Sequence, residues 1–101
     1  MTESEFIAAA EAVFQRIDQA LENSDIDVSL NEGVLELELE DGAKIIISRH
    51  VPNREIWLAA KSGGFHFRWN GALWQDTRSG EEFFSQLTMC LQQAGAGGVA
   101  F

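Results

Sequence analysis

Carboxylates dominate one short stretch of this sequence, residues 25–42, which reads DIDVSLNEGVLELELEDG. Seven of its eighteen residues are Asp or Glu, and none is Lys or Arg. Carboxylate oxygens are hard ligands that suit Fe²⁺, Mn²⁺, Mg²⁺ or Ca²⁺, and without His or Cys they do not make a closed zinc site. Oxygens on an open surface leave water to complete the coordination. The stretch therefore predicts weak, multiple and poorly selective cation binding.

The same stretch must place its acids on one face. Apolar residues alternate with the others on both sides of residues 31–33, a pattern that predicts two half-buried strands joined by a turn. If the apolar residues share one face, Asp27 lies opposite Glu38 and Asp25 opposite Glu40 on the other. Like charges in such pairs are unfavourable without a counter-charge. They indicate either a solvated face that protects an edge strand or a cation-binding surface.

A helix over about residues 3–22 extends this acidic surface. Thr2 and Glu5 have the spacing of a capping box, and apolar residues then recur at steps of three and four. The stripe that we expect to be buried comprises Phe6, Ala10, Val13, Phe14, Ile17 and Leu21. At 100° per residue, the polar side chains that fall together on one flank are Glu11, Gln15, Asp18 and Glu22.

A second group of residues predicts protein recognition. Alternation in EIWLAA sends Trp57 to the face opposite the core, and alternation in FHFRW sends His66 and Arg68 to the same face. Arg54 precedes the first of these strands. Trp and Arg are enriched where protein interfaces are strongest, so Trp57 with its basic neighbours is a candidate partner anchor. The alternative is that Trp57 only covers the sheet.

We find no enzyme centre in the sequence. His50 and His66 are far apart and lack the spacing of a zinc motif. Cys90 falls on the apolar face of a predicted helix, where a thiol is inert. The Gly-containing turns lack the residues of a phosphate loop.

The order of predicted elements indicates the fold class. Six strands follow one another with short turns, between the first helix and a second that a capping box at Ser79 and Glu82 would open. Consecutive strands with tight turns predict an antiparallel sheet, and two amphipathic helices can cover only one of its faces. We expect one α+β domain over residues 1–101, a two-layer sandwich of about six strands with one face open. The apolar tail VAF would fold back on the core.

Charge narrows the classes of partner. The net charge is −9, and residues 1–42 hold twelve acids and one base, whereas residues 43–101 hold four acids and six bases. Such a surface disfavours nucleic acid and favours cations or basic proteins. No apolar run reaches the roughly 20 residues of a membrane span. The acidic N-terminus is not a targeting peptide, so we expect a bacterial cytoplasmic protein.

Several of these motifs occur together in one known family. The run DIDVSLNEGVLELELEDGAKIIISRHVPNREIWLAAKSGGFHF, followed by RSGEEFF, resembles the frataxin family. The shared features are acidic first elements, a break at a proline, the WLA strand with its Trp, the GGFHF strand and RSGE before the last helix. The resemblance runs from Ser4 to Phe101.

This resemblance implies an α-β sandwich without enzymatic activity of its own, apart from weak ferroxidation in some family members, and a role in iron-sulfur cluster assembly. Family members bind Fe²⁺ and Fe³⁺ loosely, with other divalent cations as competitors, and contact the cysteine desulfurase and the scaffold protein. We refer to the metal-binding set that it implies here as the acidic ridge: Glu11, Asp18, Glu22, Asp25 and Asp27. The acids that adjoin it are Glu36, Glu38, Glu40 and Asp41. The residues expected to contact partners are Asp18, Glu22, Arg54, Trp57, His66 and Arg68.

Three functions remain open on these grounds. The first is an iron donor or regulator of the desulfurase and scaffold complex, acting as a monomer. The second is an iron store or detoxifier that forms oligomers as iron is added. The third is a structural interaction module for which metal binding is incidental.

Overall fold

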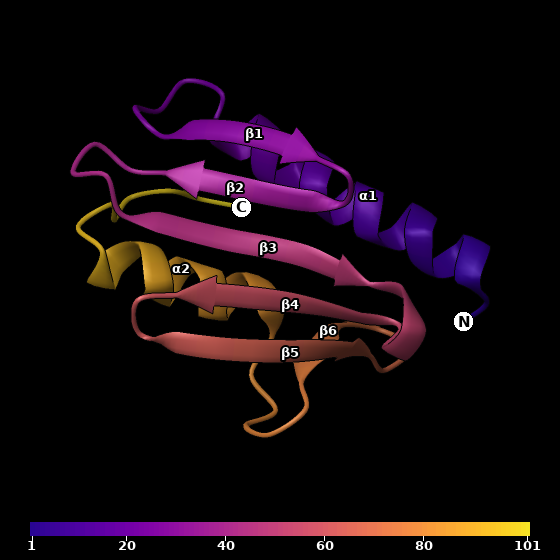
Figure 1. The fold of residues 1–101 in the computed structure, drawn as a ribbon. Helices are drawn as coiled ribbons and strands as arrows, with labels where there is room; N and C mark the ends of the chain where they lie inside the picture. Colours follow the sequence, from indigo (N-terminus) through magenta and orange to yellow (C-terminus); the bar gives the residue numbers. More distant parts are fainter.

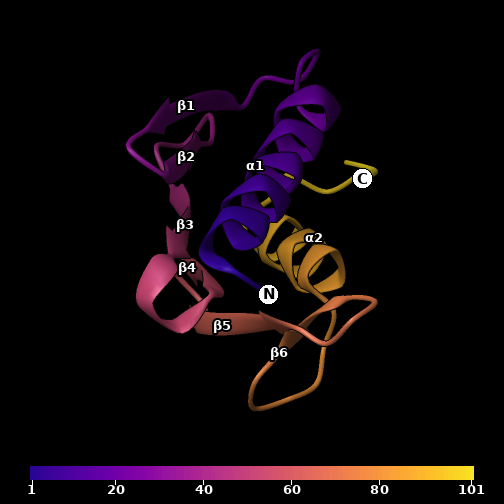
Figure 2. The ribbon, with the colours of Figure 1, turned by 90° about the vertical axis from the view of Figure 1, so that its right-hand side faces the viewer.

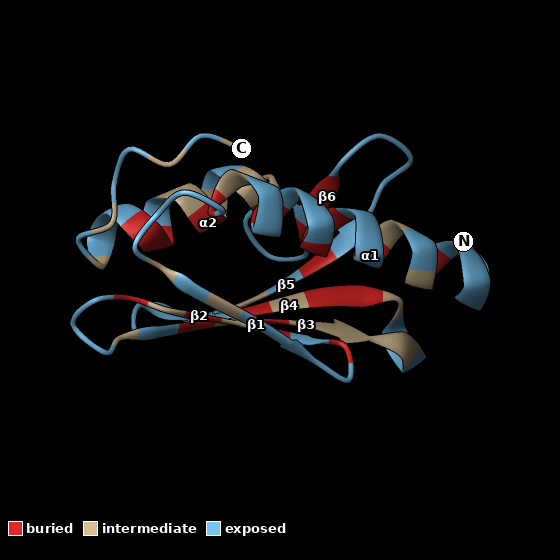
Figure 3. Cartoon of the chain, turned by 90° about the horizontal axis from the view of Figure 1, so that it is seen from above, coloured by how far each residue is buried: buried red, intermediate tan, exposed pale blue.

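A computed structural model describes residues 1–101, which form two helices and a six-stranded sheet (Figure 1). Neighbouring strands are antiparallel, and their order in the sheet is their order in the chain. Both helices pack on the same face of the sheet, and the other face is open (Figures 2 and 3). This confirms the predicted two-layer sandwich. The elements are α1 (Glu3–Ala20), β1 (Asp27–Asn31), β2 (Val34–Glu38), β3 (Lys44–His50), the 3₁₀ turn η1 (Val51–Asn53), β4 (Glu55–Ala60), β5 (Gly63–Trp69), β6 (Trp74–Asp76) and α2 (Phe83–Gln93).

Helix α1 begins and packs as the sequence predicts. The Glu5 amide donates to the Thr2 hydroxyl at 3.1 Å, and the Thr2 amide donates to the Glu5 carboxylate at 2.8 Å, which completes the capping box. All six residues of the predicted stripe are buried. The acidic flank of α1 is exposed. The helix ends at Ala20, two residues earlier than expected.

The hairpin of β1 and β2 has the predicted register. Asp27 lies opposite Glu38, and the apolar residues of the two strands pair with one another. The turn consists of Glu32 and Gly33, both with positive φ (51° and 79°), the conformation of a two-residue hairpin turn that matches the strand twist. Because β1 begins at Asp27, the predicted pair of Asp25 with Glu40 lies beyond the ladder.

The start of α2 differs from the prediction. Its N-cap is Glu82, whose carboxylate accepts from the amides of Phe84 at 2.7 Å and Ser85 at 3.1 Å. Ser79 instead belongs to the preceding turn, where its amide donates a hydrogen bond to the buried carboxylate of Asp76 at 3.1 Å. The predicted capping box is therefore wrong. A carboxylate can satisfy the free amides of a helix start as well as a hydroxyl can.

Two apolar side chains expected in the core are exposed. Leu30 is 59% exposed because it lies at the end of the outermost strand, where α1 does not cover it. Trp69, the last residue of β5, is 38% exposed and meets Trp74 at 61°, with ring centroids 5.5 Å apart. Periodicity assigns a face to a residue, but the extent of the covering layer decides whether that face is buried.

The C-terminal tail folds back as expected. Val99 and Phe101 pack against the core, and the ring of Phe101 lies 5.4 Å from that of Phe84. Cys90 is buried on α2, as predicted. Neither helix combines the length and the apolar character that crossing a bilayer requires.

Candidate functional site

The acidic ridge is exposed along α1, the following loop and the start of β1. Its residues do not converge on one point. Glu11 and Asp18 line a groove of about 420 Å³ between α1 and the inner face of β1 and β2. Asp27 lies on the open face of the sheet, opposite Glu38.

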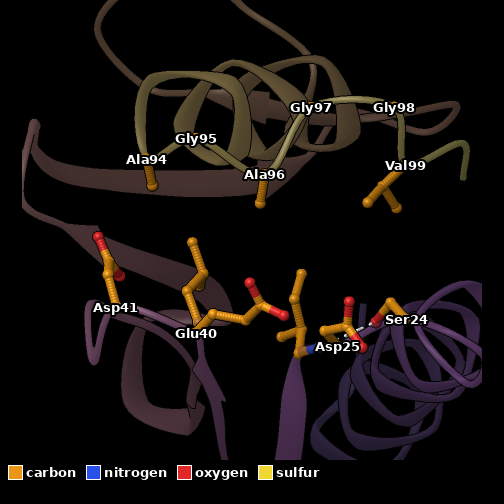
Figure 4. Close-up of a pocket in the computed structure, with 12 residues that line it drawn as sticks. Ser24, Asp25, Glu40, Asp41, Ala94, Gly95, Ala96, Gly97, Gly98 and Val99 are labelled. Atoms are coloured by element: carbon orange, nitrogen blue, oxygen red, sulfur yellow. Dashed lines mark hydrogen bonds between the residues drawn. The ribbon is translucent and has the colours of Figure 1, made fainter.

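A second cavity brings together acids from the loop before β1 and the loop after β2. Asp25, Glu40 and Asp41 line a space of about 530 Å³ together with the tail residues 94–99. Figure 4 shows the three carboxylates on one side of this space and the tail on the other. The two parts of the chain that meet here lie more than fifty residues apart, so sequence spacing alone does not reveal the cavity.

Two basic residues form ion pairs with acids of this surface. The Arg49 guanidinium lies 3.9 Å from the Glu11 carboxylate, and the Lys44 ammonium lies 3.6 Å from that of Glu36. These pairs are partly exposed, so each contributes at most about 1 kcal/mol. The sequence did not reveal them because both depend on how β3 lies beside its neighbours.

The carboxylates form no ready-made metal centre. Nowhere do three or more His, Cys, Asp or Glu side chains come together in a way that could hold an ion. Separate exposed carboxylates can still attract hydrated cations through their summed field. The geometry is therefore suited to loose, exchangeable binding.

A stack of three rings, which we call the aromatic ladder, lies on the open face of the sheet. His50, Trp57 and His66 come from β3, β4 and β5 and lie nearly parallel. The ring centroids of His50 and Trp57 are 4.0 Å apart at 10°, and those of Trp57 and His66 are 4.3 Å apart at 9°. The prediction that Trp57, His66 and Arg68 share this face is confirmed. Trp57 is only half-buried, so part of its ring is exposed to solvent.

The carboxylate of Glu55 contacts the aromatic ladder and Arg68. This residue was not identified from the sequence. It is 5% exposed although it lies on the open face. Its carboxylate accepts from Trp57 Nε1 at 2.9 Å and from the Arg68 guanidinium at 2.6 Å, and it lies 3.8 Å from His66 Nδ1. Strict alternation in EIWLAA already placed Glu55 beside Trp57, so the signal was present.

The environment of Glu55 changes its acidity. Desolvation by burial acts to raise its pKa, but the hydrogen bonds from Trp57 and Arg68, with the positive charge of Arg68 and His66, outweigh it. The pKa of Glu55 is therefore held below its usual value. A carboxylate that stays ionised keeps Trp57 and Arg68 fixed.

His50 and Arg54 flank the 3₁₀ turn η1. Arg54 adopts the left-handed conformation after η1, and its guanidinium donates to the Val51 carbonyl, so this side chain is held in its own turn. His50, for which the sequence predicted no role, stacks on Trp57. Its place follows from the pairing of β3 with β4 across η1, which the sequence did not define.

Comparison with known proteins identifies the family of this chain. The family model described as a frataxin-like domain matches residues 1–97. The curated protein "Iron-sulfur cluster assembly protein CyaY" of Dechloromonas aromatica is 52% identical over 99 residues, which cover 94% of each chain.

Two solved structures are also similar. The frataxin of Psychromonas ingrahamii is 37% identical, with a TM-score of 0.91 over 98% of this chain and 96% of that one. Trimeric frataxin of the yeast Saccharomyces cerevisiae, complexed with ferrous iron, is 26% identical, with a TM-score of 0.64 over 91% of this chain and 83% of that one. The chain therefore belongs to the frataxin family.

Proposed function

We propose that this chain is an accessory protein of iron-sulfur cluster assembly that uses two surfaces, the acidic ridge and the aromatic ladder. The observation that carries the proposal is their separation on one sheet: the acids gather around β1 and β2, and the ladder spans β3 to β5. The name of the relative from D. aromatica, an iron-sulfur cluster assembly protein, supports the pathway.

The acidic ridge binds iron as cargo. Its carboxylates are exposed, lack imidazole or thiolate companions and form no closed ligand set. Such ligands favour Fe²⁺ or Fe³⁺ with retained water, and they release the ion readily. Mg²⁺ and Mn²⁺ compete for the same oxygens.

The acidic ridge also docks on a basic surface of the cysteine desulfurase, and the aromatic ladder provides a second contact with the assembly complex. Trp57 is a rigid anchor because Glu55 and two imidazoles hold it in place. Iron and the desulfurase use the same carboxylates, so iron and salt should each weaken the complex.

A pull-down with the desulfurase tests the docking. The double variant Asp18→Asn and Glu22→Gln should reduce the captured amount at least about fivefold at low salt. The control variant, Glu3→Gln with Glu81→Gln, removes the same charge from exposed positions outside the ridge and should bind as the wild type does. Equal binding by all three proteins would contradict electrostatic docking through the ridge.

A second candidate function is iron storage by oligomers, with weak ferroxidation. It is favoured by the yeast neighbour, which is trimeric and complexed with ferrous iron. Size-exclusion chromatography with rising Fe²⁺ under air distinguishes the two functions. Growth of oligomers with added iron supports storage, and a persistent monomer supports the accessory role.

A further inference from the structure

Strand β1 forms an open edge of the sheet. It pairs only with β2, and no other element lies along its outer side (Figure 1). An edge strand presents unpaired N–H and C=O groups along its length, which can accept a further strand. The opposite edge, β6, has only three residues, whereas β1 has five.

An apolar groove lies beside this edge. Its floor consists of Phe14 on α1 and of Val28, Leu30 and Leu35 on the first hairpin, and its volume is about 420 Å³. Leu30 is 59% exposed although it points to the side of the sheet that the helices cover. A strand added to β1 would send every second side chain to this side, beside Leu30.

The walls of the groove are acidic. Glu11 and Asp18 line its helical side. Asp27, at the start of the same strand, lies on the open face. Of these acids only Glu11 has a salt bridge, to Arg49 at 3.9 Å. The acids repel the edge of a second copy of this chain, which carries the same charges. They favour a strand that carries Lys or Arg.

We propose that β1 and this groove form a docking site for an extended, basic segment of a partner protein, which adds to the sheet as a seventh strand. Its apolar side chains cover Leu30 and the groove floor, and its basic side chains lie on the open face beside Asp27 and Glu38. Glu11 and Asp18 add to the negative field that attracts the segment. The inference rests on the proposed docking of a partner on the acidic ridge. It adds that the part of the partner that binds there is an extended strand.

NMR titration of the ¹⁵N-labelled chain provides the test. The probe is the capped peptide Lys-Val-Lys-Val-Lys-Val-Lys. We expect the amide signals of residues 27–31 to shift and the hydrogen exchange of the edge-facing amides to slow about tenfold. The same peptide, N-methylated at its central Val and at the neighbouring Lys, keeps its charge but loses strand pairing on both sides. It should leave the exchange of β1 unchanged.

Matched variants distinguish specific binding in the groove from non-specific hydrophobic binding. Leu30→Gln should weaken binding of the probe peptide and of the desulfurase about fivefold, because it removes the exposed apolar contact. Leu73→Gln alters a Leu that is 52% exposed in the loop between β5 and β6 and should bind as the wild type does. Both sites are exposed, so neither change should unfold the protein.

Two results would overturn the strand addition. Equal binding of the parent and N-methylated peptides would mean that charge alone attracts them. Slowed exchange at β1 in the free chain at high concentration, together with a dimer, would mean that the occupant is a second copy. Neither result affects the proposed docking on the desulfurase, provided that the Asp18→Asn and Glu22→Gln variant still binds the desulfurase more weakly than the wild type does. If that variant binds the desulfurase as well as the wild type, the proposed function itself is contradicted.

Discussion

The open face of the sheet has an acidic half, on β1 and β2, and an aromatic half, on β3 to β5. Side chains that face each other across the strands repel in the first half and attract in the second. On β1 and β2, Asp27 lies opposite Glu38, and the two like charges repel each other. On β4 and β5, Glu55 lies opposite Arg68, and Trp57 opposite His66. On the acidic half, Asp27 therefore has no opposite charge across from it in the hairpin. The aromatic half uses its own groups to hold one side chain, Trp57, in a fixed position.

This contrast predicts different costs of mutation, the largest at Glu55. Glu55→Ala should lower the free energy of unfolding by about 2 kcal/mol, because Trp57 and Arg68 lose a charged acceptor. Glu38→Ala, on the acidic half, should change it by less than about 0.5 kcal/mol. Urea denaturation checks both variants. Equal losses would contradict the difference between the two halves.

Acidification sharpens the same comparison. Because the pKa of Glu55 is lowered in the folded state, its ionised form contributes stability above its ordinary pKa that is lost as pH falls through the folded-state value. The difference in stability between the wild type and Glu55→Gln should be full at pH 7 and shrink below about pH 4.5. Urea midpoints measured between pH 7 and pH 3 check this. A constant difference would mean that the carboxylate charge is not what stabilises the ladder.

A smaller effect is expected at Trp57. Trp57→Phe keeps a ring between His50 and His66 but removes the 2.9 Å hydrogen bond to Glu55, so stability should fall by about 1 kcal/mol. Thermal denaturation measures the loss. An unchanged Tm would indicate that stacking alone positions Trp57.

The smallest effect is on the acidic half. Asp27→Asn removes one of two opposed charges, and the free energy of unfolding should rise by about 0.5 kcal/mol at low ionic strength. Added NaCl should reduce the gain, since salt screens exposed charges. Melts at about 10 and 500 mM NaCl test this, with Ser29→Thr on the same face as the control. A gain that is independent of salt would have another cause.

The sequence predicted the acidic half better than the aromatic half, for a physical reason. The acids follow one another along a helix and a hairpin, so periodicity alone places Glu11 and Asp27. The ladder depends on pairing across β3, β4 and β5, and His50 reaches Trp57 only through the geometry of η1. Glu82 and Leu30 were assigned wrongly because cap choice and helix coverage are tertiary properties.

One measurement compares the two halves directly, namely a paramagnetic NMR titration of the ¹⁵N-labelled chain with Fe²⁺ under nitrogen. We expect the amide signals of Asp18, Glu22, Asp25 and Asp27 to broaden first, and those of His50, Trp57 and His66 to stay sharp. Mg²⁺ in excess should restore the broadened signals, because hard cations compete for the same oxygens. Broadening that begins at the imidazoles of the ladder would contradict the assignment of iron to the acidic ridge.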